Sequence, residues 1–415
     1  AAIIGGVDID NIGNRGIEKY YDELLQGTEG RVEFERGPFG EIPGTSSSVK
    51  TAVPGNDLVL TLDSQMQWLT QKVVRDKVLE TGAAWGSAVV MQTRTGEILG
   101  MASMVRDDED GTVGPASYNR PMMDVYEPGS VAKVFTIAGA LEAGIVQRDT
   151  VIEIEATRTV ADVTFAEHGG AKTLTVEQIL QTSSNLGTVG IAEELGKQRL
   201  YDTLRGFGLG QATGPGGEAQ FPGESRGILA EPDEWSGTSL ATISYGHGMS
   251  TTVLQLAAGY NAIANGGEYI SPTLVRATID GSGKHQSMPE PPRRRVMSEE
   301  AAATIGDIME GVVHGVGTGN AAAVPGYLVA GKTGTAKIPD LENGGYRDDA
   351  FIATFAGFAP SKNPEVTIVV VIAEPVGAYY ASAVAAPLFS ELAGLALRTL
   401  RIPPTETIED ADVAE

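Results

Sequence analysis

The sequence predicts an α+β fold in which a central antiparallel sheet is covered by helices. Strand patterns lie toward both ends of the chain, and the middle has mostly helical periodicity. A sheet built from the two ends needs helices on its faces to bury its apolar side chains. The longest apolar stretch, Thr367 to Ala373, has the length and the β-branched content of a buried strand in that sheet.

Composition bounds the size and class of the protein. At 415 residues the chain is too long for one ordinary domain, so two or three are expected. No run of about 18 apolar residues occurs, so nothing in this sequence reads as a membrane span. The absence of cysteine excludes disulfides and thiolate metal sites, and it fits an extracytoplasmic protein. The net charge of −24 argues against nucleic acid as a partner, because phosphate backbones are bound by clustered lysine and arginine.

The first elements are short. Ile17 to Leu25 has the pattern of a short amphipathic helix, and Gly37 to Ser48 is rich in turn residues without a core pattern. Leu58 to Leu62 reads as a strand, after which Asp63 caps a helix that runs from Ser64 to about Leu79. The chain starts without an initiator methionine or a signal peptide, so we expect it to be part of a longer protein.

A hairpin and a helical region come next. Ser87 to Gln92 and Glu97 to Ala102 are apolar runs joined by a Gly-containing turn, which predicts a hairpin. Met104 to Ser117 is acidic and Gly-rich and is expected to be a loop. Helical periodicity starts at Ser130 directly after Pro128-Gly129, and it returns from Thr175 to about Gly206.

The last part of the chain combines helices with three strands. A Gly- and Pro-rich stretch precedes this part of the chain. The Arg293-Arg294-Arg295 cluster, which lies between two of the expected helices, is expected to be a solvated loop. The expected elements are a loop over 208–231, helices over 254–265, 298–313 and 383–400, and strands over 327–330, 353–358 and 366–373.

Three short strings occur in one order along the chain. They are Ser130-Val131-Ala132-Lys133, then Ser183-Ser184-Asn185, then Lys332-Thr333-Gly334-Thr335. Each string is a weak signal alone, but together they form a complete set for a serine nucleophile that takes an acyl group from a peptide. The sequence therefore predicts serine-based acyl transfer.

The first string supplies the nucleophile and its base. A serine hydroxyl needs a neighbouring base, and residues i and i+3 of a helix lie about 5–6 Å apart on one face. Ser130 is thus the predicted nucleophile, at a helix start whose N–H groups favour a developing alkoxide, and Lys133 is the predicted base. Lys133 must be neutral for this role, and burial beside Lys332 would lower its pKa.

The other strings supply relay and binding groups. Ser183 and Asn185 are expected to pass the proton on and to hold substrate amides. Lys332 is expected to bind a carboxylate, and Thr333, Gly334 and Thr335 to lie along an edge where a substrate peptide pairs with the main chain. The backbone N–H groups of Ser130 and Thr335 are the predicted oxyanion donors.

Other copies of these patterns show how common each one is. Ser47-Ser48-Val49-Lys50 also matches the first string, but it lies in a Ser/Gly-rich stretch that reads as a linker. Ser117-Tyr118-Asn119 matches the second string at the end of a predicted loop. Among the four histidines no metal-ligand spacing emerges, and His247 is expected to pack or to contact a loop.

With these strings the chain resembles the class B penicillin-binding proteins, the monofunctional D,D-transpeptidases of cell-wall synthesis. The likeness covers nearly the whole chain. Within the family, the chain is most similar to the division-specific septal type. The segments that carry it are YEPGSVAK (126–133), QTSSN (181–185), AGKTGTA (330–336), GIEKYYDELLQGTEG (16–30), LVLTLDSQMQ (58–67), GFGLG (206–210), YGHGMSTTVLQLAAGYNAIANGG (245–267), FAGFAP (355–360) and YYASAVAAPLF (379–389).

The resemblance implies a mechanism and a setting. Ser130 attacks the D-Ala-D-Ala bond of a peptidoglycan stem peptide, releases the terminal D-Ala and passes the acyl group to an amine of a neighbouring stem, and β-lactams acylate the same serine. It implies no metal and no organic cofactor. It also implies a location on the extracytoplasmic face of the cell membrane, an N-terminal anchor absent from this chain, and a membrane glycan polymerase and division proteins as partners.

The resemblance further implies a domain division. Residues 1–55 are expected to be part of a non-catalytic pedestal, residues 56–405 the transpeptidase domain, and residues 406–415 an acidic, disordered tail. Two alternatives stay open. A serine β-lactamase shares the three strings, but Glu193-Glu194-Leu195 fits poorly as its extra glutamate motif, and a β-lactam sensor would carry the same set without turnover.

Overall fold

A computed structural model describes residues 2–405, and these form two compact units. The first unit comprises the chain up to Thr61 together with Thr273–Glu290, and the second comprises Leu62–Pro272 together with the residues from Pro291 onward. The segment Thr273–Glu290 belongs to the first unit, whereas a division of the chain at residue 55 alone would assign it to the second. The expected acidic tail at 406–415 lies outside the described residues.

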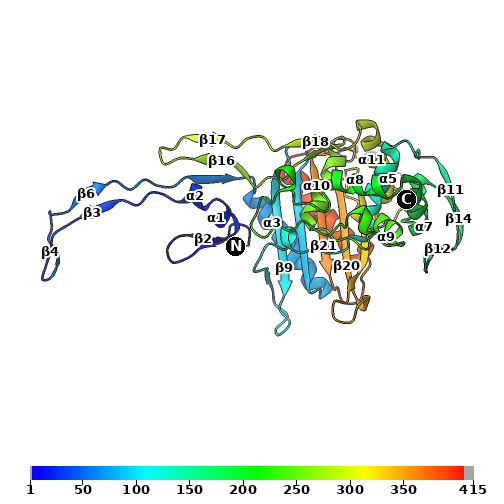
Figure 1. The fold of residues 1–415 in the computed structure, drawn as a ribbon, viewed down its shortest axis with the longest axis horizontal. Coiled ribbons are helices and arrows are strands. Elements are labelled where there is room, and N and C mark those ends of the chain that lie inside the picture. Colours follow the sequence, from blue (N-terminus) through cyan, green and yellow to red (C-terminus); the bar gives the residue numbers. More distant parts are fainter. Residues whose placement is uncertain (1, 406–415) are drawn as a thin grey trace. The chain divides into compact units, whose positions relative to one another are not determined.

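The first unit is built from short strands and two short helices. The expected helix from Ile17 to Leu25 is present as two pieces that are interrupted at Tyr21. Strand β16 pairs with both β7 and β17, so the returning segment is held to the first unit by backbone hydrogen bonds. The elements are β1 (Gly6–Val7), β2 (Gly13–Arg15), α1 (Gly16–Tyr20), α2 (Asp22–Leu25), β3 (Arg31–Glu33), β4 (Arg36–Gly37), β5 (Gly40–Glu41), β6 (Ser47–Lys50), β7 (Asp57–Leu60), β16 (Val275–Ile279) and β17 (His285–Ser287) (Figure 1).

The second unit is centred on one six-stranded sheet in which every neighbouring pair of strands is antiparallel. The predicted strand at Thr367 to Ala373 lies inside this sheet as part of β21, which begins at Val366 and has all eight of its residues buried. In spatial order the strands are β10 (Val113–Pro115), β9 (Ile98–Arg106), β8 (Trp85–Gln92), β21 (Val366–Ala373), β20 (Tyr346–Ala359) and β19 (Ala330–Pro339). The predicted α+β fold with a helix-covered antiparallel sheet is confirmed.

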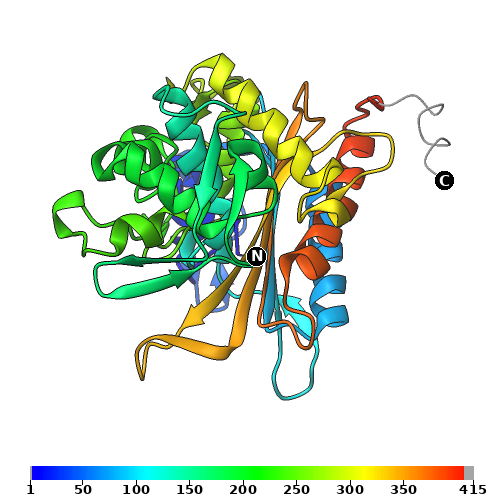
Figure 2. The same cartoon turned by 90° about the vertical axis from the view of Figure 1, so that its right-hand side faces the viewer.

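Helices cover both faces of the sheet (Figure 2). One face packs against α3 (Ser64–Thr81) and α12 (Ala381–Thr399), which also contact each other. The opposite face packs against α10 (Val253–Ala264), whose twelve residues are all buried. The other helices on that side of the sheet are α4 (Arg120–Met123), α5 (Lys133–Glu142), α6 (Val176–Gln181), α7 (Asn185–Leu195), α8 (Lys197–Gly206), α9 (Ser239–Ser244) and α11 (Glu299–His314).

Capping side chains explain where several helices begin. Asp63 accepts a hydrogen bond from the Met66 N–H at the start of α3, and Ser298 does the same for Ala301 at the start of α11. The Asp63 cap was predicted, and both caps work because a short polar side chain satisfies an N–H that has no partner within the helix. Among residues 2–405, none of the helices combines the length and the apolar character that crossing a bilayer would take.

Three predicted loops contain strands. The stretch from Met104 to Ser117 was predicted to be a loop, but β9 extends to Arg106 and β10 forms beyond it. The arginine cluster forms β18 (Arg293–Arg295), which pairs with β15 (Glu268–Ile270). Ser47–Lys50 is strand β6 and not a linker. The sequence patterns gave no assignment for two antiparallel strand pairs, β11 (Val151–Ile154) with β14 (Lys172–Thr175) and, between them in the chain, the hairpin of β12 (Thr157–Val160) with β13 (Val163–Ala166).

Candidate active site

The structure brings the first and second strings into direct contact. The Lys133 Nζ donates hydrogen bonds to the Ser183 carbonyl oxygen and to the Asn185 Oδ1, each at 2.6 Å. The Ser183 Oγ lies 3.2 Å from the same nitrogen. Two segments about fifty positions apart in the sequence therefore meet at the Lys133 amine.

Ser130 lies in a single 3₁₀ turn, η1 (Gly129–Ala132), and is partly buried. The α-helix α5 begins only at Lys133, whose N–H donates to the Ser130 carbonyl. The predicted helix start is therefore correct in place, but its first turn is tighter than an α-helix. Gly129 enters the turn with φ +60°, a conformation that favours glycine.

The second string forms the junction between helices α6 and α7. Ser183 has φ +61°, which is unusual for a residue with a side chain. The Ser184 hydroxyl caps α7 by accepting from the Gly187 N–H at 3.1 Å, so Asn185 is the first residue of that helix. The buried carboxylate of Glu167 accepts from the Leu186 N–H at 2.9 Å and further secures the junction.

Lys133 is fully buried, and its environment favours the neutral amine. Desolvation by burial lowers its pKa well below the ordinary value for lysine, and repulsion from Lys332 lowers it further. The negative charge of Glu167 acts in the opposite direction. The two causes predicted from the sequence, burial and the second lysine, are both present.

The third string lies within strand β19, at the edge of the sheet, where a strand edge was predicted. Lys332 is fully buried, and burial lowers its pKa to about 7. Its Nζ donates to the Thr333 carbonyl at 3.1 Å and lies 3.3 Å from the Thr333 Oγ1. The Thr333 hydroxyl in turn lies 2.7 Å from the Thr318 hydroxyl, and the Thr335 Oγ1 accepts from the Ala381 N–H at 3.0 Å.

Gly334 is where the first and third strings touch. A Cβ at this position would lie 2.8 Å from the Pro128 carbonyl oxygen and 3.0 Å from a methyl group of Val131. A strand glycine lets another backbone approach closely, and the backbone that approaches here is the chain's own turn before Ser130. This contact brings the turn against β19.

Three side chains near Ser130 were not predicted as a group. The carboxylate of Glu127, which is buried, contacts the Tyr346 hydroxyl at 2.9 Å and the His247 Nδ1 at 3.1 Å. Glu127 precedes Pro128-Gly129 directly, so an acidic residue just before the Ser130 turn was the one signal that the sequence offered. Its partners lie more than a hundred positions away and carry no local pattern.

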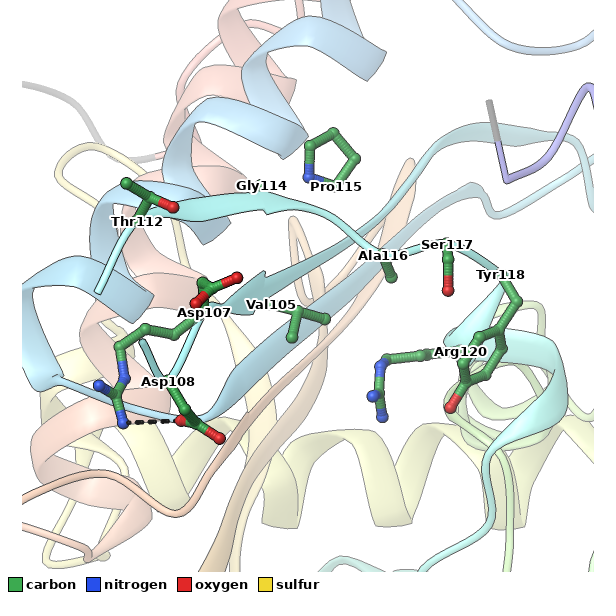
Figure 3. A pocket seen from close by; sticks show the side chains of 11 residues that line it. Val105, Asp107, Asp108, Thr112, Gly114, Pro115, Ala116, Ser117, Tyr118 and Arg120 are labelled. Atoms are coloured by element: carbon green, nitrogen blue, oxygen red, sulfur yellow. Dashed lines mark ion pairs between the residues drawn. The ribbon is translucent and has the colours of Figure 1, made fainter. Parts of the chain in front are cut away.

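A separate cavity of about 470 Å³ lies beside the β9–β10 hairpin (Figure 3). All of its lining residues fall between Val105 and Arg120, so it is distinct from the three strings. Arg106 and Asp108 form an ion pair at 3.5 Å. Asp108 lies on one side of the cavity in Figure 3, and Arg120 lies on the other. Ser117 lines this cavity, so the second copy of the Ser-x-Asn pattern lies outside the lysine cluster.

Two family descriptions match the chain. Residues 86–394 match the penicillin-binding protein transpeptidase domain, and residues 6–60 match the penicillin-binding protein dimerisation domain. The first match covers most of the chain and includes all three strings.

Similar proteins and structures support the same relationship. The chain is 37% identical to the penicillin-binding protein PbpB of Mycobacterium tuberculosis over 97% of its own length and 61% of that protein's length. It is 34% identical to a probable peptidoglycan D,D-transpeptidase PenA of Neisseria meningitidis over 100% of its own length and 69% of the relative's. It is 35% identical to the peptidoglycan D,D-transpeptidase FtsI of Escherichia coli over 97% of its own length and 66% of the relative's.

Among solved structures, penicillin-binding protein 3 of Mycobacterium tuberculosis aligns with a TM-score of 0.85 and 34% identity, over 98% of this chain and 90% of that one. The ampicillin complex of the same protein aligns with a TM-score of 0.85 and 34% identity, over 98% and 89% of the two chains. The chain spans about three fifths of the length of the curated relative PbpB. With both domains matched and the transpeptidase fold shared over nearly its full length, the chain belongs to the class B penicillin-binding proteins.

Proposed function

We propose that this protein is a serine D,D-transpeptidase that cross-links peptidoglycan stem peptides. The observation that carries the proposal is the environment of the Lys133 amine. In its neutral form the amine has two N–H donors, which match the two acceptors at 2.6 Å, the Ser183 carbonyl and the Asn185 Oδ1. Its lone pair is then left for a hydroxyl proton, as a general base requires.

Acylation starts when Lys133 takes the proton of the Ser130 hydroxyl. The Ser130 Oγ then bonds to the carbonyl carbon of the penultimate D-Ala, and the N–H groups of Ser130 and Thr335 stabilise the oxyanion. The proton returns through Lys133 and Ser183, whose Oγ is 3.2 Å from Nζ, to the leaving amine. The C–N bond breaks, and the terminal D-Ala departs with that proton.

Transfer reverses these steps with a different amine. An amine from a second stem peptide attacks the acyl-enzyme, gives its proton to Lys133 through Ser183, and forms the cross-link as Ser130 leaves and is reprotonated. The edge of β19 supports substrate alignment, because an edge strand has free main-chain groups for an extended peptide. Lys332 and Thr333 would bind the terminal carboxylate, with Gly334 keeping the turn close to that edge.

The relatives support a wider setting for this activity. Three of them are named for D,D-transpeptidase activity or penicillin binding, and one solved relative is a complex with ampicillin. We propose that this chain is likewise acylated by β-lactams. We further assign to it septal wall synthesis at the extracytoplasmic face, an anchor outside this sequence, a membrane glycan polymerase and division proteins as partners, and the division into residues 1–55 and 56–405.

The proposal is tested by incubating the protein with a stem-peptide thioester analogue, a D-amino acid acceptor and, separately, a fluorescent penicillin. A transpeptidase produces the exchanged product, a sensor stops at the acyl-enzyme, and a β-lactamase destroys the penicillin within minutes. Ser130→Ala is expected to abolish covalent labelling. Retained labelling in this variant would remove Ser130 as the nucleophile.

The role of Lys133 is tested by Lys133→Ala. Loss of a general base typically costs about 10²- to 10⁴-fold in rate, so acylation by the penicillin should slow by that amount while initial binding persists. Acylation at a near-normal rate would show that another group accepts the Ser130 proton.

A further inference from the structure

Glu127 is a buried carboxylate three positions before Ser130, and the mechanism above gives it no part. Its side chain is 9% exposed, and a carboxylate buried to this extent needs good hydrogen-bond partners to remain charged. The partners come from two other segments of the second unit. Glu127 is therefore a buried contact between three segments of the second unit and not a surface charge.

Both carboxylate oxygens of Glu127 are engaged. Oε1 accepts from the Gly248 N–H at 2.8 Å and from the Tyr346 hydroxyl at 3.1 Å, and Oε2 accepts from the same hydroxyl at 2.9 Å. The His247 Nδ1 lies 3.1 Å from Oε2. The ring of His247 also packs edge-on against Tyr346, with 5.8 Å between the ring centroids.

The backbone around Glu127 is tied to the same loop. The Gly129 N–H donates to the Gly246 carbonyl at 3.0 Å, and Tyr126 exchanges two backbone hydrogen bonds with Thr251. A Cβ on Gly246 would lie 2.1 Å from the Gly129 carbonyl oxygen, so the two backbones are in direct contact. The turn before Ser130 therefore lies on the 246–251 loop, with the Glu127 side chain as its polar attachment.

Tyr346 connects this attachment to the third string. It is the first residue of β20 and is paired with Pro339 at the end of β19, the strand that carries Lys332. Glu127 consequently joins the turn that holds Ser130 to the hairpin that holds Lys332. A single carboxylate thereby links two of the three catalytic strings.

The charge state of Glu127 agrees with this role. Burial alone would raise its pKa, but hydrogen bonds and attraction from His247, the Gly248 N–H and Tyr346 outweigh burial and leave the pKa below the usual value for glutamate. The carboxylate stays ionised at neutral pH, and an ionised carboxylate can accept hydrogen bonds but cannot donate them. Its three donors match that state.

We propose that Glu127 is a positioning residue for acylation, which holds the Ser130 turn in register with the β19–β20 hairpin through Tyr346, His247 and Gly248. This inference rests on the proposed function of Ser130. Glu127 acts through the backbone that it holds. A displacement of about 1 Å in a reacting group can cost about 100-fold in rate, so losing this attachment should slow acylation.

The test measures acylation by a fluorescent penicillin in a stopped-flow instrument, which separates the acylation rate constant from the dissociation constant of the initial complex. Glu127→Ala is expected to lower the rate constant by about 100-fold and to leave the dissociation constant within about threefold. Glu127→Gln keeps an acceptor for Gly248 and Tyr346, so it should recover the rate to within about tenfold of the original. Asp348→Asn, whose side chain is 96% exposed on the same hairpin, is the matched control and should acylate normally.

Tyr346→Phe keeps the proposal testable if Glu127→Ala does not fold. It removes one hydrogen bond to a charged group and should slow acylation by about tenfold, and it should have little further effect when Glu127 is already replaced. The proposal is overturned if Glu127→Ala acylates within about threefold of the original, if glutamine recovers nothing, or if the two substitutions have independent effects. The original protein must be labelled and Ser130→Ala must not be, which distinguishes failure of this inference from failure of the proposed function.

Discussion

Two lysine side chains, Lys133 and Lys332, are fully buried in the second unit, and repulsion from Lys332 adds to the effect of burial on the pKa of Lys133. A buried ammonium is costly, so both groups are driven toward the neutral form. The proposed mechanism uses this effect directly, because a neutral Lys133 is a base. The stability of the protein should therefore depend on pH through the same two residues.

Lys332 makes that dependence measurable. Its pKa is about 7 in the folded protein, whereas lysine in an unfolded chain titrates near 10.4. Between these values the unfolded state binds more protons, so the free energy of unfolding should rise with pH, by up to about 1.4 kcal/mol per pH unit from this residue. Below pH 7 this contribution should level off. Urea unfolding at pH 7, 8 and 9 measures the slope.

Lys332→Met should reduce that slope by removing the titrating group. Lys337→Met on the same strand is the control, since Lys337 lies at the surface with its ammonium 2.7 Å from Asp348. An unchanged slope in the Lys332→Met variant would contradict the account of a desolvated Lys332.

Individual residues also show the limit of prediction from sequence. The three strings could be found because their chemistry recurs in a fixed order, and the structure brings Lys133, Ser183 and Asn185 together. Glu127 and Tyr346 could not be found as a pair, because 219 positions separate them and no local pattern connects them. Contacts of this kind depend on how the sheet is assembled.

At the scale of elements, the contact between η1 and β19 depends on the absence of a side chain at residue 334. Gly334→Ala would place a Cβ within 3.0 Å of backbone and side-chain atoms of the turn, and such overpacking typically costs about 1–3 kcal/mol. We expect a lower unfolding free energy and slower acylation, because the turn that moves away carries Ser130. Thermal unfolding and penicillin labelling measure the two effects.

Gly114→Ala is the matched control for this substitution. Gly114 lies in β10 of the same sheet, with no atom within 4 Å of an added Cβ among the described residues. It should leave labelling unchanged. Equal effects of the two substitutions would mean that any glycine-to-alanine change in this sheet has the same effect, and that the close approach of the Ser130 turn to Gly334 is not the cause.

The cap of α3 gives a second prediction for an element. Asp63→Ala removes the acceptor for the Met66 N–H at 2.8 Å, which should cost about 1 kcal/mol of stability. Asp63→Asn retains an acceptor and should be close to neutral. Chemical denaturation of the three proteins tests this, and an alanine variant as stable as the original would mean that water replaces the cap without cost.

Helices and long strands were predictable because their signals are local. Caps and apolar periodicity located α3, α10, α11 and α12, and the run of β-branched residues located β21. The short strands were missed because cross-strand partners stabilise them. Arg294 illustrates this, since its guanidinium lies 3.7 Å from the centre of the Tyr269 ring on the paired strand, where the sequence suggested a solvated loop.

At the scale of the whole molecule, the sheet of the second unit is assembled from both ends of its sequence. Strand β21 pairs with β8 over eight residues, and the segments with Ser130 and Asn185 lie between them in the chain. This topology brings β19 to the sheet edge beside the Ser130 turn. The return of Thr273–Glu290 to the first unit could not be predicted, because it depends on the pairing of β16 with β7 across more than two hundred positions.

The central claim is that Ser130 alone forms the acyl-enzyme. The most direct measurement is peptide mapping by mass spectrometry after reaction of the protein with a penicillin. The predicted result is one adduct, with the full mass of the penicillin, on the peptide that contains Ser130. An adduct on Ser47, on another residue, or no adduct at all would contradict the account.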